Sequence, residues 1–97
     1  MFIVVTLTYP LIQSKKIGAL FTSGKLPDAS PAKLEKIMVV SDGDIKVYAI
    51  YEVPNDKVYE GIKTISARYA GYLEVEDFKY KLEPTLSAEE ALPMIGL

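Results

Sequence analysis

The dipeptide Asp42-Gly43 lies between two apolar-rich segments, and it constrains the fold more than any other feature of this sequence. An Asp-Gly pair favours the two-residue type I′ turn, because both central positions of that turn need a positive φ. The flanking segments 33–41 and 44–53 have the length and composition of strands, and the second one alternates between two faces. We therefore predict a β-hairpin in the middle of the chain.

A strand and a helix are predicted on each side of this hairpin. Residues 1–9 are apolar on both faces and rich in β-branched side chains, which favours a first strand, and residues 11–23 then have helical spacing. Pro54-Asn55-Asp56 supplies a polar cap and an acidic charge for the start of a second helix. A fourth strand is expected at 75–83.

The second helix and the C-terminal segment have clear local signatures. Apolar residues of the helix step by four, three, four and three, which is one amphipathic stripe: Val58, Ile62, Ile65, Tyr69 and Tyr72. Ser87 and Glu90 have the spacing of a capping box, which predicts a short helix that Pro93 ends. No linker or repeat divides the chain. We therefore expect a single domain, residues 1–97, with a short C-terminal helix and tail at 87–97.

The order strand–helix–strand–strand–helix–strand predicts an α+β fold. Two right-handed crossovers joined by a hairpin give a ferredoxin-like βαββαβ sandwich, in which a four-stranded antiparallel sheet carries two helices on one face. The first and third strands are central in that topology. They are also the strands that are most apolar on both sides, so the composition agrees with the topology.

The face of the sheet opposite the helices is expected to be apolar. Pairing about Asp42-Gly43 puts Ile37 beside Tyr48. The expected apolar set on this face is Phe2, Val4, Ile37, Val39, Tyr48 and Ile50. A small monomer rarely leaves so large an apolar surface in water. We predict a homodimer that packs sheet to sheet through this set, with the chain's own tail, residues 92–97, as the alternative cover.

The composition excludes several classes of function. The chain has no Cys and no His, which removes thiolate and imidazole metal sites, cysteine nucleophiles and histidine bases. We expect no metal and no cofactor. A net charge of −2 with a single arginine argues against nucleic-acid binding. No apolar stretch approaches the roughly 20 residues of a membrane span, and no signal peptide is apparent, so no membrane partner and a cytoplasmic location are expected.

Polar side chains are interspersed among the apolar ones on the same face. The candidate ligand-binding residues are Thr6, Thr8, Tyr48, Glu52 and Lys79. A few polar groups in an apolar concavity are typical of a small-molecule site. Tyr48 and Thr6 would orient a ligand there, and Glu52 or Lys79 would move a proton. The alternative is a dimer interface with an apolar core and a polar rim, without chemistry.

Two segments carry a family resemblance. Residues 78–91, which begin FKYKLEP, and residues 5–10, VTLTYP, resemble a small uncharacterised family of the dimeric α+β barrel superfamily. The resemblance implies a homodimer whose two sheets enclose a cavity. It implies no particular reaction, because this fold hosts monooxygenases, isomerases, haem enzymes and ligand-sensing domains.

These observations lead to one functional expectation with two alternatives. We expect a small homodimeric protein that binds a small molecule or serves as an accessory module, because no catalytic set is recognisable. The first alternative is a cofactor-independent enzyme, isomerase or monooxygenase-like, with its site between the two sheets. The second is a protein-interaction adaptor that uses exposed edge strands.

Overall fold

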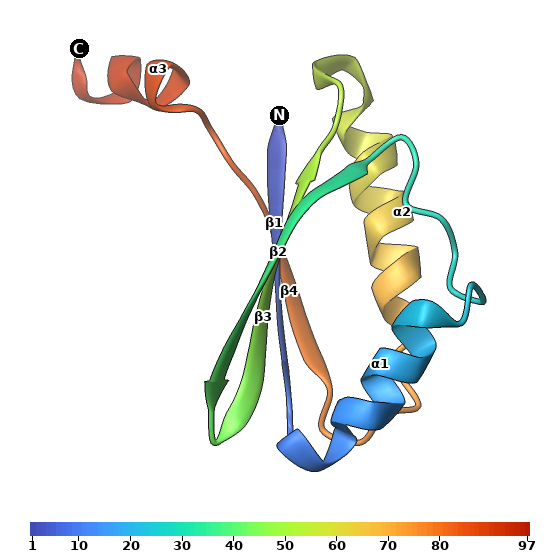
Figure 1. The fold of residues 1–97 in the computed structure, drawn as a ribbon. Helices are drawn as coiled ribbons and strands as arrows, with labels where there is room; N and C mark the ends of the chain where they lie inside the picture. The colour runs from blue at the N-terminus through green and yellow to red at the C-terminus, as the bar shows by residue number, and fades with distance from the viewer.

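One antiparallel sheet organises the structure, a computed structural model that describes residues 1–97 (Figure 1). Its strands are β1 (Phe2–Tyr9), β2 (Lys33–Asp42), β3 (Asp44–Glu52) and β4 (Lys79–Pro84). The helices are α1 (Ser14–Thr22), α2 (Val58–Ala70) and α3 (Ala88–Ala91), and the 3-10 turns are Leu11–Gln13, Asn55–Lys57 and Leu92–Ile95. The strand order is β2-β3-β1-β4, so β1 and β3 are central, as predicted.

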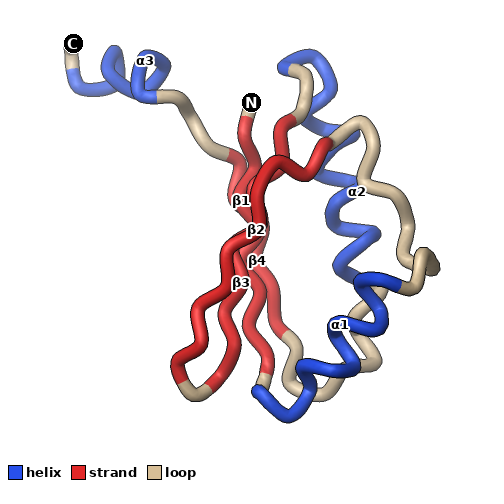
Figure 2. Tube along the Cα trace, viewed as in Figure 1, coloured by secondary structure: helices blue, strands red, loops and turns tan.

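The helices α1 and α2 lie on one side of the sheet, and α3 lies apart from both (Figure 2). The predicted stripe of α2 faces the sheet: Ile65 and Tyr69 are buried, as is Tyr72 in the turn just after the helix, while Val58 and Ile62 are half-buried and pack against the core. The inward residues of β1 and β3 are also buried, and on β3 the buried residues follow the predicted alternation. Aromatic rings join the layers, because Tyr69 packs edge-on against Tyr51 of β3.

The fourth strand begins later than the sequence predicts. It runs from Lys79, because the chain makes turns before that point: Tyr72 O accepts from Val75 N, and Val75 O accepts from Phe78 N. Asp77 has a φ of +62°, which does not occur in a strand. The segment 75–78 is therefore a turn that leads into β4.

The pairing of β2 with β3 differs from the prediction by one residue. Gly43, at a φ of +78°, forms the hairpin tip alone, so Asp42 pairs with Asp44. The pairing then puts Ile37 opposite Ala49, and Val39 opposite Val47, both on the helix side. Because a one-residue shift exchanges the faces of a strand, the prediction that Ile37 and Val39 lie on the open face is wrong. Met38 and Val40 lie there instead, opposite Tyr48 and Lys46.

The face without helices is called the open face below. The alternation and the pairing put these apolar side chains on it: Phe2, Val4, Met38, Val40, Tyr48 and Ile50. Phe2, Met38 and Val40 are exposed, and the others are half-buried. The tail does not cover them, because the chain leaves the sheet beyond the end of β4 and continues away from it (Figure 1). No helix of the chain combines the length and the apolarity that crossing a membrane requires.

Candidate functional site

The open face has a shallow depression between β3, β1 and β4. It has a volume of about 460 Å³ and is lined by Val4, Thr6, Thr8, Lys46, Tyr48, Lys79, Tyr80, Lys81 and Glu83. Thr6 lies between Tyr48 on β3 and Lys81 on β4, and Thr8 lies between Lys46 and Lys79. The structure thus brings together four of the five candidate residues: Thr6, Thr8, Tyr48 and Lys79.

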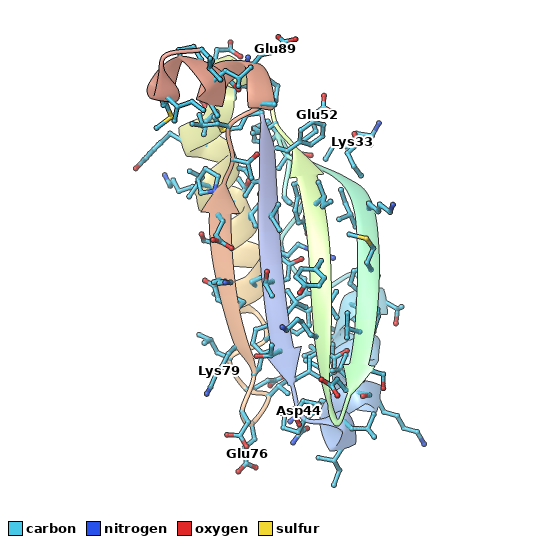
Figure 3. All side chains as sticks on the ribbon, turned by 90° about the vertical axis from the view of Figure 1, so that its left-hand side faces the viewer. Lys33, Asp44, Glu52, Glu76, Lys79 and Glu89 are labelled. Atoms are coloured by element: carbon cyan, nitrogen blue, oxygen red, sulfur yellow. The ribbon has the colours of Figure 1, made fainter.

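Glu52 lies apart from the other candidates. It is paired with Phe2 of β1 and Lys33 of β2, whereas Lys79 is near the other end of the sheet. Figure 3 shows the open face with Glu52 at one end of the strands and Lys79 at the other. A ligand in the depression would therefore not reach both groups, so Glu52 and Lys79 do not form an acid–base pair.

The depression is rich in positive charge. Lys46, Lys79 and Lys81 surround it, and the only carboxylate in its lining is Glu83, whose Oε1 lies 3.6 Å from Lys81 Nζ. Lys46 Nζ lies 5.9 Å from the centre of the Tyr48 ring, within the range of a cation–π contact. These side chains are long and partly solvated, so they can adapt to an approaching anionic surface.

A second pocket lies on the other side of the sheet, between α1 and the strands. Its volume is about 200 Å³ and ten of its twelve lining residues are apolar. The lining comprises Leu7, Tyr9, Ser14, Ile17, Gly18, Phe21, Ile37, Val39, Val47, Ala49, Tyr69 and Tyr72. Gly18 contributes to this space because it has no side chain, and a Cβ built there would have no atom within 4 Å. We call this space the α1 pocket.

The α1 pocket contains one polar atom without a partner. Ser14 Oγ is buried, yet it makes no hydrogen bond. Buried hydroxyls are nearly always bonded, because an unpaired one loses its hydrogen bonds to water without replacement. Ser14 Oγ is therefore available to donate a hydrogen bond to a ligand, or to accept one.

The other polar groups of the α1 pocket are phenols. The hydroxyls of Tyr69 and Tyr51 share a buried hydrogen bond of 2.9 Å. Burial raises the pKa of Tyr69 far above its ordinary value, and the nearby Tyr51 hydroxyl raises it further. Burial also raises the pKa values of Tyr9 and Tyr72. Tyr9, Tyr69 and Tyr72 therefore stay protonated at neutral pH, so their hydroxyls can hydrogen-bond to a ligand but cannot serve as bases.

The α1 pocket was not among the predicted sites. Ile17 and Phe21 contribute to the helical apolar spacing of residues 11–23, but such a pattern does not show how far a helix lies from its sheet. The only available signal was the pair Ser14 and Gly18, which are four residues apart and thus share a helix face. No group of three acidic side chains converges anywhere in the chain.

The adaptor alternative depends on exposed edge strands, and β2 is one of the two edge strands of the sheet. All ten residues of β2 are exposed, and the strand is outermost in the sheet. The pairing is irregular between Leu34 and Lys36, where Glu35 bulges out of register. A bulge with charged neighbours hinders the addition of a further strand.

Comparisons of the chain with protein-family models, with curated proteins and with solved structures found no significant match. The two concave sites and the surfaces around them are therefore the features that bear on function.

Proposed function

We propose that this chain is a small-molecule-binding module and that the α1 pocket is its binding site. The observation that carries the proposal is the unpartnered hydroxyl of Ser14 inside an otherwise apolar pocket. Ligand sites are typically apolar cavities with a few polar groups that fix orientation. The volume of about 200 Å³ suits a molecule of about one aromatic ring, since an apolar cavity of about 150 Å³ holds benzene. The ligand class is thus a small apolar ring with one hydroxyl or carbonyl.

Binding of phenol and of toluene, followed by amide chemical shifts, tests the proposal. The two probes have similar size, but only phenol can hydrogen-bond to Ser14 Oγ. Ser14→Ala should weaken phenol binding roughly fivefold, the effect of one hydrogen bond of about 1 kcal/mol, and leave toluene binding unchanged. Gly18→Leu should block both probes while the chain still folds, because the added side chain enters open space. If neither probe shifts residues of the α1 pocket, the proposal fails.

We also propose that the fold is the ferredoxin-like βαββαβ arrangement and that two copies pack through their open faces as a dimeric α+β barrel. The strand order β2-β3-β1-β4 and the two helices on one side support the fold. The exposed apolar side chains of Phe2, Met38 and Val40 support the dimer, because a partner would remove them from water.

Light scattering of charged variants tests the dimer. Val4→Asp and Ile50→Asp each put a carboxylate into the proposed interface, so either variant should be monomeric or insoluble. The matched control is Leu73→Asp, at a residue that is exposed after α2 and lies outside the open face. A wild-type mass of one copy, or an unaltered dimer in both interface variants, would contradict this assembly.

A second candidate function is a site between the two sheets, favoured by the lysines and hydroxyls of the open-face depression. Lys46, Lys79 and Lys81 next to Thr6 and Thr8 would suit an anionic ligand. Catalysis there has less support than binding, because Glu52 is at the other end of the sheet. Titration of the wild type and Lys79→Gln with malonate tests this candidate: a tenfold weaker affinity of the variant would favour it.

A further inference from the structure

The C-terminal segment, residues 85–97, extends away from the body of the protein. Figure 1 shows it on the side of the sheet opposite α1 and α2, near the N-terminal end of β1. The radius of gyration is 14.8 Å, whereas a compact domain of this length has about 12.5 Å. The longest dimension, 47 Å, is also well above the other two, 28 and 18 Å. We call this segment the arm.

The arm is tied to the body at its first residue. Thr85 N donates to Phe2 O over 3.1 Å, and Thr85 Oγ1 donates to the same oxygen over 2.7 Å. Every other hydrogen bond of the arm is internal. In particular, Ser87 and Glu90 form the predicted capping box, which starts α3. The arm therefore has a defined local structure, and hydrogen bonds join it to the body only through Thr85.

The side chains of the arm are unusually apolar for an isolated segment. Its exposed apolar residues are Leu86, Leu92, Met94, Ile95 and Leu97, and the last three are 73–82% exposed. A helix of four residues followed by a 3-10 turn is too short to be stable by itself in water, where isolated helices need about 12–15 residues. A capped turn with an apolar side is thus suited to docking on another surface.

The open face of a second copy fits the arm in position, polarity and charge. The arm projects on the open-face side, where a sheet-to-sheet partner would lie (Figure 1). The partner would present its exposed Phe2, Met38 and Val40 to the apolar residues of the arm. The acidic Glu89 and Glu90 of the arm match the lysines around the open-face depression, Lys46, Lys79 and Lys81.

We propose that the arm clasps the open face of a second copy, so that two copies exchange their arms across the interface. This inference rests on the proposed dimer and adds to it the segment that holds the two copies together. The partner's arm then covers apolar surface that the sheet of one copy leaves exposed. It also closes the open-face depression with an acidic lid.

Removal of the arm is the first test. A chain that ends at Thr85 keeps both bonds to Phe2, so it should unfold at the same temperature as a monomeric wild type at high dilution. Its dimer dissociation constant should rise at least about 100-fold, because several large apolar contacts are lost. Met94→Lys with Ile95→Lys should act in the same direction, whereas the control Leu73→Lys should leave the constant unchanged.

Cross-linking is the second test. An equal mixture of protein labelled with nitrogen-14 and with nitrogen-15 is treated with a carbodiimide, which joins carboxylates directly to amines. We expect mixed-isotope links from Glu89 or Glu90 to lysines of the open face, and none to Lys15, Lys16 or Lys63 of the helices.

The two proposals fail in different ways. A monomeric full-length chain would overturn the dimer and the arm exchange together. A full-length dimer whose dissociation constant is the same without the arm would overturn only the arm exchange. Links from the arm that join same-isotope chains only, or that reach only the helix lysines, would also overturn it.

Discussion

Replacement of Tyr69 by Phe should make the protein less stable at neutral pH and more stable at high pH. The Tyr69 hydroxyl is buried and shares its hydrogen bond with the Tyr51 hydroxyl. At pH 8 the variant loses this bond and leaves Tyr51 without a partner. The expected loss in the free energy of unfolding is about 1 kcal/mol.

The sign reverses at high pH because Tyr69 is kept neutral in the folded state. Its pKa is raised by burial and by Tyr51, whereas in the unfolded chain a tyrosine has a pKa of about 10. The stabilisation is thus fully present below about pH 10 and is lost as the pH rises toward the folded-state pKa. By linkage, the wild type loses about 1.4 kcal/mol at pH 11 and about 2 kcal/mol at pH 11.5 through this one group. Tyr69→Phe has no phenol at this position and does not lose this stability. The free energies of unfolding of the wild type and the variant should therefore cross between about pH 10.5 and 11.

Urea unfolding followed by far-UV circular dichroism measures this crossing, since the chain has no tryptophan for fluorescence. The two proteins are compared at intervals from pH 8 to 11.5, so that the titration of lysines cancels in the difference. Tyr59→Phe is the matched control, because Tyr59 is 70% exposed and is hydrated in both states. Stability curves of the wild type and Tyr69→Phe that stay parallel up to pH 11.5 would refute the reasoning.

Two pairs of substitutions give further predictions. Gly18→Ala should raise the free energy of unfolding by up to about 1 kcal/mol, because its Cβ meets no atom, whereas Gly61→Ala should lower it by about 1–2 kcal/mol. The added Cβ at Gly61 would lie 2.7 Å from a methyl carbon of the buried Val53. Thermal unfolding of Gly18→Ala and Gly61→Ala measures both effects. Met38→Asp should disrupt the dimer in light scattering and leave phenol binding intact, while Ile37→Asp should abolish phenol binding. If Met38→Asp abolished phenol binding and Ile37→Asp disrupted the dimer, the observed pairing of β2 would be contradicted.

The elements that were predicted correctly are those in which local pattern and packing agree. The predicted stripe steps by three and four, and its last three residues, Ile65, Tyr69 and Tyr72, are buried, while Val58 and Ile62 are half-buried. On β3, the alternate residues Ile45, Val47, Ala49 and Tyr51 form the more apolar set, and these are the residues that are buried. Ser87 and Glu90 form their capping box because it needs only four consecutive residues.

The α1 pocket could not be predicted because a sequence pattern contains no information on the distance between a helix and a sheet. Ser14, Ile17 and Gly18 do lie on the inner side of α1, and their spacing is visible in the sequence. The volume between a helix and a sheet depends on the distance between them, which loops and distant contacts determine. Likewise, the location of Glu52 relative to Lys79 depends on their places along paired strands. Alternation put both on one face but gave no distance between them.

The register of β2 was mispredicted because this strand is apolar on both faces. Residues 37–40 are Ile, Met, Val and Val, so a shift by one residue exchanges two apolar pairs and changes the hydrophobic energy little. The turn then determined the pairing, and Gly43 forms its tip alone instead of sharing it with Asp42. A strand that is apolar on both faces needs apolar surroundings on each side. In this structure one side of β2 borders the α1 pocket and the other belongs to the open face. Because both faces of β2 are apolar, the sequence does not determine its register. The same property allows β2 to contribute to the α1 pocket on one side and to the open face on the other.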